Sequence, residues 1–508
     1  MSTAHNPLAK LAELKARLSE VDDLNRANAI LNWDQSTYMP PGGGPARGRQ
    51  SATLGRLAQE KFVDKAVGQL LDDLEPYERS LPFDDDGASL IRATRRNYLK
   101  SIKVPPAFLG EFYAHGSDSF MAWMLARPAN DFKAVVPYLE KTLEYSRKMA
   151  GFFAPYEHIA DPLIDFADDG MRVSTVSAVF GRLRERLVPI ARQILAQTPA
   201  DDSCLKQAYP EDLQLAFGRK VVEKMGYDFK RGRQDKTHHP FCTTFSVGDV
   251  RITTRVKPND LSEALFSTMH EAGHAMYEQG VNPAYEASPL QGGTSAGVHE
   301  SQSRTWENLV GRSREFWSHF YPQLQSVFPA QLGSVDEDTF YRAINKVERS
   351  LIRTDADEVT YNLHVMIRFD LELQLLEGGL SITDLPEAWN ARYQSDLGIV
   401  APDNKDGCLQ DVHWYAGLIG GSFQGYTLGN ILSAQLFAAA ERSRPSIRAE
   451  LGQGAFGTLH TWLRENVYAH GSKYTANELV QRVTGGPLDV EPYIAYLRTK
   501  YGGLYSLA

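Results

Sequence analysis

Two histidines and a glutamate lie together near the middle of the 508-residue chain, at His270, Glu271 and His274. Residues four apart share one face of an α-helix, so the two imidazoles can bind one metal ion while Glu271 lies beside them. A glutamate in that place can take a proton from water during peptide-bond hydrolysis. The pattern therefore predicts a zinc peptidase centre. The alternative, two histidines that only form hydrogen bonds in a helical core, gives the glutamate no role.

A third metal ligand must come from elsewhere, because catalytic zinc takes three protein ligands and keeps a fourth position for water. Glu300 follows His274 by 26 residues, after a glycine-rich stretch at 291–297 that can turn the chain back. His299 is the rival ligand. The two are neighbours and point in different directions on a helix, so only one can face the metal ion. The third histidine of the metzincin pattern is absent after Gly280, and we predict Glu300 as the ligand.

The segment 260–280 is predicted to be the metal-binding helix. Asp260 and Glu263 have the spacing of a capping box, and Gly280 followed by Pro283 supplies the end. An apolar stripe at helical spacing favours burial of this helix and consists of Leu261, Leu265, Met269 and Met276.

The segment 242–256, directly before this helix, is the one convincing β region in the sequence. Two β-rich runs, Cys242–Val247 and Val250–Val256, flank the two-residue turn Gly248-Asp249 and predict a hairpin. In a peptidase such a strand can pair with an extended substrate backbone. The alternative is a small structural sheet with Arg251 and Arg255 in solvent.

Helices are expected through most of the remaining chain. Apolar periodicity predicts helices at Pro7–Leu31, Arg47–Phe62, Gly87–Lys103, Phe132–Tyr156, Ser174–Thr198, Val335–Leu351 and Asp357–Leu376. Prolines and glycines between Trp33 and Pro45 indicate a loop, and Gly378-Gly379 ends the last helix. Without a flexible linker, residues 1–508 are expected to form a single, mainly α catalytic domain with lobes around a groove.

The composition limits the partners and the location. The chain has 43% hydrophobic residues, 54 basic and 63 acidic residues and a net charge of −9. Without a basic stripe or a long apolar run, neither nucleic acid nor a membrane is an expected partner. No apolar core follows Met1, so no secretory signal is expected. Cysteines at 204, 242 and 408 have no pairing pattern, which favours a reducing compartment, the cytoplasm.

Several further motifs follow the metal-binding segment. Arg353 lies near acidic residues, a setting that usually indicates a surface ion pair. His413 and Tyr426 lie in two glycine-containing segments near the end of the chain. Both side chains can donate to the oxyanion that forms during peptide hydrolysis, although a histidine beside tryptophan is often a packed core residue.

Together, these motifs resemble the carboxypeptidase Taq family of zinc metallocarboxypeptidases. The matching segments occur in the family's order and span nearly the whole chain. They are Trp33 to Pro41, His239-Pro-Phe241, Asp249-Val-Arg251-Ile-Thr253, His270 to His274, His299-Glu-Ser-Gln302, Ile352 to Asp357, Gly407 to Trp414, Tyr474 to Val480 and Pro492 to Leu497. His-Glu-x-x-His is shared by many peptidases, but the whole set is specific to this family.

The resemblance implies a mostly α-helical homodimer with a small sheet and a deep groove between two lobes. It implies removal of single residues from peptide C-termini with broad specificity and poor release of proline. It places one zinc ion per subunit, which cobalt can replace, on His270, His274 and Glu300, with Glu271 as catalytic base and acid. One departure concerns Gly421-Ser-Phe-Gln-Gly425, where the family pattern has Gly-Tyr-Phe-Pro, and it affects the expected placement of Tyr426.

A carboxypeptidase must also bind a free carboxylate, and arginine can do so through two parallel hydrogen bonds. We predict Arg353 as this anchor, with Arg251, Arg255 and Arg304 as competitors. The matching motifs add three further substrate-binding candidates, His239, Gln302 and Asp411.

Two other functions compete with this one. A zinc endo-oligopeptidase or dipeptidyl carboxypeptidase would use the same metal chemistry with a different anchor and a different groove end. A peptide-binding protein with a relic zinc site would not need Glu271.

Overall fold

Helices dominate the computed structural model of the protein, which describes residues 6–507. The α-helices are α1 (Pro7–Thr37), α2 (Gly44–Phe62), α3 (Lys65–Ser80), α4 (Asp86–Ser101), α5 (Pro106–Ala126), α6 (Phe132–Gly151), α7 (Asp161–Ala167), α8 (Val173–Leu195), α9 (Glu211–Met225), α10 (Leu261–Gly280), α11 (Ala296–Arg304), α12 (Arg314–Val327), α13 (Pro329–Leu332), α14 (Glu337–Ile344), α15 (Tyr361–Glu377), α16 (Leu385–Leu397), α17 (His413–Ala416), α18 (Gln424–Ser443), α19 (Ile447–Leu451), α20 (Gly457–Asn466), α21 (Ala476–Thr484) and α22 (Glu491–Tyr505). A π-helical turn, Thr305–Val310, continues α11. The mainly α fold class is therefore confirmed.

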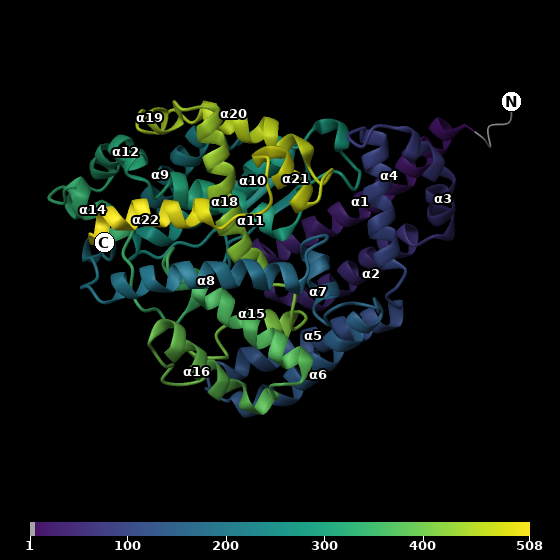
Figure 1. The fold of residues 1–508 in the computed structure, drawn as a ribbon, viewed down its shortest axis with the longest axis horizontal. Helices are drawn as coiled ribbons and strands as arrows, with labels where there is room; N and C mark the ends of the chain where they lie inside the picture. Colours follow the sequence, from purple (N-terminus) through teal and green to yellow (C-terminus); the bar gives the residue numbers. More distant parts are fainter. Residues whose placement is uncertain (1–5, 508) are drawn as a thin grey trace.

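The helices α10, α11 and α18 lie together in the upper middle of the molecule (Figure 1). The N-terminal helices α1–α4 lie to one side of them, and α5, α6, α15 and α16 lie below. Most buried apolar side chains belong to one large core that extends from α5 to α22. A smaller core joins α1, α3 and α4 to Val247, Val281, Tyr285 and Leu290. Each core brings segments that are distant in sequence against the region around α10.

Helix α10 forms where the sequence predicts a metal-binding helix. The Asp260 side chain accepts a hydrogen bond from the Ser262 backbone N–H at 3.0 Å. The second half of the predicted capping box is wrong, because Glu263 forms ion pairs with Arg255 and Lys257 instead. All four residues of the predicted apolar stripe are buried, which fixes α10 inside the protein.

Within the described residues, the sheet has three strands, in the order β1 (Gln234–Lys236), β3 (Asp249–Thr254), β2 (Cys242–Ser246). The predicted hairpin is confirmed, since β2 and β3 pair antiparallel with a register shift between Thr244 and Ser246. Strand β1 pairs parallel with β3 and was missed by the sequence analysis. Its three residues are too few for a visible alternation of polar and apolar side chains.

Several predicted helix boundaries differ from the structure, and two of them differ most. Helix α1 continues through Trp33 to Thr37, and Pro40 follows its end, so the predicted loop begins too early. The predicted helix Val335–Leu351 shortens to α14, because the Asn345 side chain donates to the Tyr341 and Arg312 carbonyls and ends the helix. Both errors concern helix ends, which depend on local capping contacts rather than on apolar periodicity.

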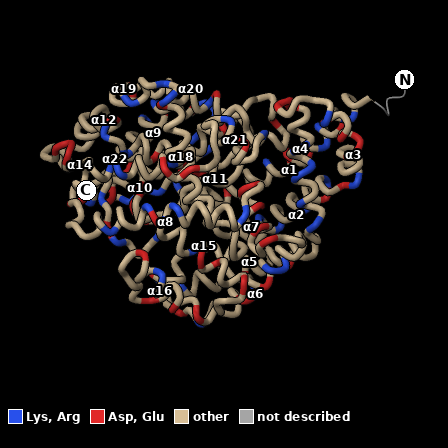
Figure 2. Tube along the Cα trace, in the orientation of Figure 1, with Lys and Arg blue, Asp and Glu red and all other residues tan. Residues whose placement is uncertain are grey.

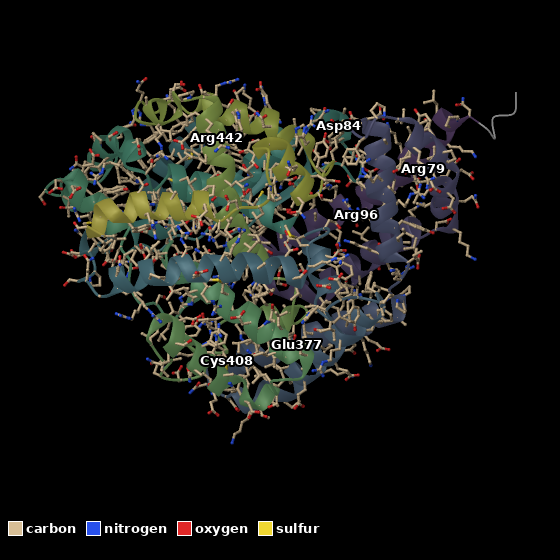
Figure 3. The ribbon with its side chains drawn as sticks, viewed as in Figure 1. Arg79, Asp84, Arg96, Glu377, Cys408 and Arg442 are labelled. Atoms are coloured by element: carbon tan, nitrogen blue, oxygen red, sulfur yellow. The ribbon has the colours of Figure 1, made fainter. Side chains whose placement is uncertain are left out.

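The charged residues are distributed over the whole molecule, and the cysteines lie in different parts of the chain. Figure 2 shows basic and acidic residues mixed along the whole trace. The cysteines at 204, 242 and 408 are free thiols, and Cys408 lies in the lower part of the view in Figure 3. Among residues 6–507, none of the helices combines the length and the apolar composition that crossing a membrane requires.

Candidate metal centre

The side chains of His270, His274 and Glu300 meet between α10 and α11. Glu300 Oε2 lies 3.7 Å from His270 Nε2 and 3.5 Å from His274 Nε2. The three candidate ligand atoms all lie within 4.8 Å of one another. Atoms that bind one tetrahedral zinc ion at about 2 Å are about 3.3 Å apart, so this arrangement fits a single metal ion.

Two glycines allow the helices to approach closely at this point. A Cβ atom on Gly273 would lie 2.6 Å from the Gln302 carbonyl oxygen, so the backbones of α10 and α11 are in contact. A Cβ atom on Gly429 of α18 would lie 2.5 Å from Glu300 Cγ. The ligand side chains therefore reach one another only because both positions lack a side chain.

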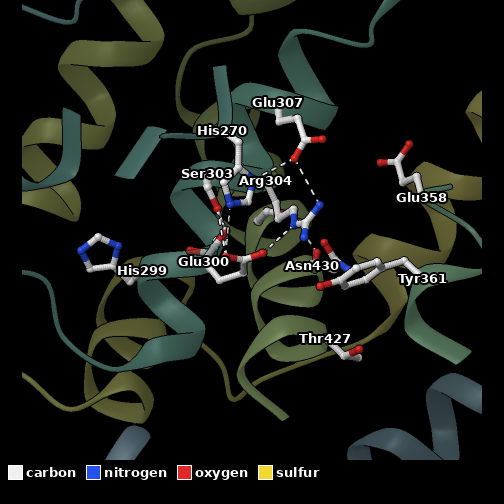
Figure 4. A network of polar contacts seen from close by, with 12 residues as sticks. His270, His299, Glu300, Ser303, Arg304, Glu307, Glu358, Tyr361, Thr427 and Asn430 are labelled. Atoms are coloured by element: carbon white, nitrogen blue, oxygen red, sulfur yellow. Dashed lines mark hydrogen bonds and ion pairs between the residues drawn. The ribbon is translucent and has the colours of Figure 1, made fainter. Parts of the chain in front are cut away.

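A carboxylate network holds the His270 side of the centre (Figure 4). His270 Nδ1 lies 2.9 Å from Glu307 Oε2, and Arg304 donates to Glu300 Oε1 at 2.7 Å and to Glu307 Oε2 at 3.1 Å. Burial opposes ionisation of Glu307, but Arg304 and His270 outweigh it and lower the pKa of Glu307 to about 2. Since Glu307 stays ionised, it accepts a hydrogen bond from the Nδ1–H group of His270. The Nε2 atom of His270 is then free to bind a metal ion.

A different arrangement holds the His274 side. His274 Nδ1 lies 2.6 Å from His299 Nδ1, and His299 Nε2 lies 2.8 Å from Glu278 Oε1. Burial opposes ionisation of Glu278, but its hydrogen bonds and the His299 charge lower the pKa of Glu278 to about 2. His299 thus faces the candidate ligand His274 rather than the point where the three candidate ligand atoms meet.

Glu271 is 7% exposed, beside the three candidate ligands. Burial raises the pKa of Glu271 to about 7, with the His270 charge opposing this shift and the carboxylates of Glu300 and Glu307 adding to it. A carboxylate with a pKa near neutrality can both accept and return a proton.

Arg353 lies in a buried cluster rather than in a surface ion pair, so the expectation from its acidic neighbours is wrong. Its Nε and Nη2 donate to Asp411 Oδ1 at 3.2 and 2.8 Å, and its Nη1 donates to Tyr361 at 2.9 Å. Arg368 also pairs with Asp411, and Gln410 accepts from the Arg353 backbone N–H and from Arg368 Nη2. These arginines hold the pKa of Asp411 well below its usual range. Two arginines with one aspartate leave an excess positive charge.

Aromatic rings connect this cluster to the candidate ligands. Arg304 lies 4.7 Å from the Tyr361 ring centre, and Arg353 lies 5.0 Å from that of Tyr426. His413 Nε2 lies 3.1 Å from the Tyr426 hydroxyl oxygen. Burial lowers the pKa of His413 to about 4, against the opposing charge of Asp411. His413 is therefore neutral at physiological pH.

Tyr426 lies in the first turn of α18, directly after the segment that departs from the family pattern. Gln424, where that pattern has proline, donates to Gly421 at 2.8 Å and to the buried Asp168 at 3.2 Å. The start of α18 is thus held by hydrogen bonds, and Tyr426 still reaches His413.

The other predicted binding residues have other contacts. Arg251 forms an ion pair with Asp249 and lies against the rings of Trp33 and Phe245, while Arg255 pairs with Glu263. His239 is exposed. Gln302 is buried and donates to Ser301 at 2.7 Å.

Three functional candidates, Glu278, Glu307 and Arg368, were not predicted from the sequence. Glu307 follows Glu300 by seven residues and Glu278 follows His274 by four, which are two turns and one turn of a helix. That spacing was available as a signal. Nothing in the sequence near Arg368 indicated its partner, which lies 43 residues away.

A helical fold in which two histidines of α10 and a glutamate of α11 lie in ligand geometry has the metal-binding arrangement of a metallopeptidase. Comparison with known families agrees, because the model of the Carboxypeptidase Taq (M32) metallopeptidase family matches residues 13–501. The chain belongs to this family and is a metallocarboxypeptidase, a peptide hydrolase.

Individual relatives cover nearly the whole chain. Thermostable carboxypeptidase 1 of Thermus thermophilus is 40% identical, over 94% of this chain and 95% of the relative. Carboxypeptidase 1 of Bacillus subtilis is 35% identical, over 96% and 97%. The crystal structure of M32 carboxypeptidase from Deinococcus radiodurans R1 is 49% identical, covers 98% of this chain and all of that chain, and has a TM-score of 0.94.

Proposed function

We propose that the protein is a zinc-dependent carboxypeptidase that removes single residues from peptides with a free C-terminus, with broad specificity and poor release of proline. The observation that carries this proposal is the cluster of His270, His274 and Glu300 beside the buried Glu271. The excess positive charge around Arg353 supports a site for a free carboxylate.

We propose that the ion is zinc, one per subunit, and that cobalt can replace it. Two imidazoles and one carboxylate are a known ligand set of catalytic zinc, and they leave a fourth position open. A divalent ion held there would supply Lewis acidity to the water and to the scissile carbonyl.

Glu271 moves the proton in the proposed reaction. Its carboxylate takes a proton from the attacking water and later passes it to the leaving amine. Its burial favours the protonated form of the carboxyl group, which supports a role in holding that proton between the two steps.

Arg353 anchors the substrate carboxylate. A guanidinium has five N–H donors, and the contacts with Asp411 and Tyr361 use Nε and one N–H on each Nη. Within residues 6–507, no other acceptor bonds to the two remaining N–H groups, which can form the parallel pair that a carboxylate accepts. Among the competitors, Arg251 pairs with one carboxylate and Arg304 lies between two, so neither brings an excess charge. Arg255 shares Glu263 with Lys257, but its side chain is 37% exposed, so solvent screens the excess charge there.

Tyr426 and His413 stabilise the oxyanion in this proposal. They share one hydrogen bond, so the Tyr426 hydroxyl is free to donate only when His413 Nε2–H donates to its oxygen and the tyrosine proton points away. Tyr426 is then the direct donor, and His413 positions it.

Tyr426→Phe is expected to lower kcat by about 100-fold with little change in KM, because an oxyanion donor acts mainly in the transition state. Steady-state kinetics on one free-acid peptide measure both constants. Tyr361→Phe, which removes a hydroxyl that contacts Arg353, is the matched control and should mainly raise KM. An unchanged kcat in Tyr426→Phe would remove this residue from the reaction.

The remaining candidates have supporting roles in this proposal. Asp411 orients Arg353 and balances its charge, and His239 is available to contact substrate at the surface. Gln302 has no direct contact with solvent, and it lies in the core at the point where α11 packs on Gly273.

A mass-spectrometric time course tests the proposed activity. One short peptide is offered with a free C-terminus and with an amidated C-terminus, with and without a metal chelator. We expect successive loss of single C-terminal residues from the free acid alone, complete inhibition by the chelator, and recovery when Zn²⁺ or Co²⁺ is added back. Equal internal cleavage of both peptides would instead indicate an endo-oligopeptidase, release of residue pairs a dipeptidyl carboxypeptidase, and binding without cleavage a relic site.

We also propose that residues 1–508 act as one catalytic domain, that the protein is a homodimer and that it is cytoplasmic. The single large core supports one domain, and the free cysteines support a reducing compartment. Sedimentation analysis should give about twice the chain mass of 56.7 kDa, and a mass of one chain would reject the dimer.

A further inference from the structure

His299 joins one candidate metal ligand to a buried carboxylate. Its Nδ1 lies 2.6 Å from His274 Nδ1, and its Nε2 lies 2.8 Å from Glu278 Oε1. It comes from α11, directly before Glu300, whereas His274 and Glu278 are one turn apart on α10. These contacts therefore run from α10 to α11 and back.

The proton positions along this chain have one consistent solution. If His274 Nε2 binds the metal ion, the proton of the neutral ring is on Nδ1, which donates to His299 Nδ1. His299 Nδ1 then carries no proton, so the ring proton of His299 is on Nε2. This N–H group donates a hydrogen bond to the Glu278 carboxylate, which can only accept.

We propose that His299 and Glu278 form a relay that fixes the orientation and the tautomer of His274, and that this relay sets the affinity of the protein for its metal ion. This inference rests on the proposed metal site. Hydrogen bonds to the ring N–H of a metal-binding histidine increase its basicity and hold its ring in place. In this relay, Glu278 acts on the ligand through an intervening imidazole.

Glu278 is held on both oxygens. Its Oε1 also accepts the Gly293 backbone N–H at 2.8 Å, its Oε2 accepts the Thr244 hydroxyl at 3.1 Å, and the residue is 6% exposed. A buried carboxylate with this many donors cannot turn away from His299 without leaving N–H or O–H groups unsatisfied. The last group of the relay, the Glu278 carboxylate, is therefore held in a fixed orientation.

Close packing also fixes the position of the His299 ring. A Cβ atom on Gly293 would lie 2.7 Å from His299 Cδ2 and 2.5 Å from Tyr277 Cε1. The ring centres of Tyr277 and His299 are 5.2 Å apart. The imidazole thus fits between the tyrosine ring and the glycine-rich loop, where any side chain at position 293 would displace it.

The two candidate histidine ligands are linked to buried carboxylates in different ways. His270 meets the carboxylate of Glu307 directly at 2.9 Å, whereas His274 reaches the carboxylate of Glu278 only through His299. Because His299 is the neighbour of Glu300, the relay also couples the helix that supplies two ligands to the helix that supplies the third.

Two substitutions of His299 on the full-length protein test the relay. His299→Phe keeps a ring and removes both nitrogens, while His299→Asn keeps an acceptor, Oδ1, near the place of Nδ1. We expect His299→Phe to raise the dissociation constant for Zn²⁺ by about 10- to 100-fold, and His299→Asn to recover most of this loss. Competition between the metal-free protein and a chromophoric chelator measures the dissociation constant.

A matched control is His319→Phe, the same substitution at another half-buried histidine, whose ring packs on Phe320 outside the metal centre. It should leave the dissociation constant unchanged. Glu278→Gln keeps the shape of the side chain and removes its charge, so it should weaken zinc binding in a second, independent way. Thermal unfolding of each metal-free variant separates loss of affinity from loss of fold.

The outcomes separate this inference from the proposed function. If the unsubstituted protein does not bind Zn²⁺, the metal site itself is wrong. If it binds and His299→Phe binds equally well, the relay is wrong. Equal weakening in His299→Phe and His299→Asn, in step with an equal fall in the unfolding temperature, would show a purely structural role and would also overturn the relay.

Discussion

Replacing Glu271 with glutamine is expected to lower kcat by about 10²- to 10⁴-fold while zinc binding is retained. Glutamine has nearly the same shape but its amide cannot accept a proton from water. The residue is 7% exposed beside His270, His274 and Glu300, so no other group replaces it easily from solvent. Turnover of a free-acid peptide and the zinc content of the purified protein are the two measurements.

Glu263→Gln is the matched control for this substitution. Glu263 lies on the same helix, α10, but near its N-terminal end, where it pairs with Arg255 and Lys257. Removing these two surface-side ion pairs should cost about 2 kcal/mol of stability or less and leave kcat unchanged. If Glu271→Gln kept full turnover with zinc bound, another base would have to act and the proposed role of Glu271 would be rejected.

The pairing of the two candidate histidine ligands could be predicted because their spacing is local. A spacing of four residues on a helix determines that His270 and His274 face the same way, whatever packs around them. The choice of Glu300 over His299 needed a second argument. Neighbours on a helix point apart, so only one of them can face a metal ion, and the absence of the third histidine of the metzincin pattern after Gly280 favoured the carboxylate. The structure shows where the two neighbouring side chains lie. Glu300 lies with the candidate histidine ligands, and His299 contacts His274.

The Arg353 cluster was not predictable in the same way. The residues near Arg353 in sequence suggested a surface ion pair, but its partner Asp411 comes 58 residues later and the pair is buried. Sequence neighbours carry no information about such a contact, which depends on how the segment before α15 and the segment before α17 pack. Strand β1 was missed for a related reason, because three residues take their structure from the partner strand.

The resemblance to a family supplied what local geometry could not. Periodicity and spacing predicted helices, a hairpin and a metal site, but they did not distinguish a carboxypeptidase from an endo-acting enzyme. That distinction depends on an anchor for the terminal carboxylate, and the structure offers a physical basis for one in the excess charge of Arg353 and Arg368 over Asp411.

Replacing Arg353 with methionine is expected to remove the preference for free-acid over amidated peptides. With Arg353 absent, Asp411 is balanced by Arg368 alone and the cluster loses its excess positive charge. Loss of a buried, hydrogen-bonded partner for the substrate carboxylate should lower kcat/KM for the free acid by about 30- to 1,000-fold, or about 2–4 kcal/mol. The amidated peptide has no carboxylate to lose, so its slow or absent cleavage should not fall further.

Two further variants separate charge from geometry in this cluster. Arg353→Lys keeps the charge but not the two parallel N–H groups, so it should recover only part of kcat/KM. Arg251→Met removes the competitor that pairs with Asp249 and should preserve the preference for the free acid. If Arg251→Met lost that preference and Arg353→Met kept it, the anchor would be Arg251. The buried cluster of Arg353, Arg368 and Asp411 would then serve to hold the loop before α17 in place, with no direct part in substrate binding.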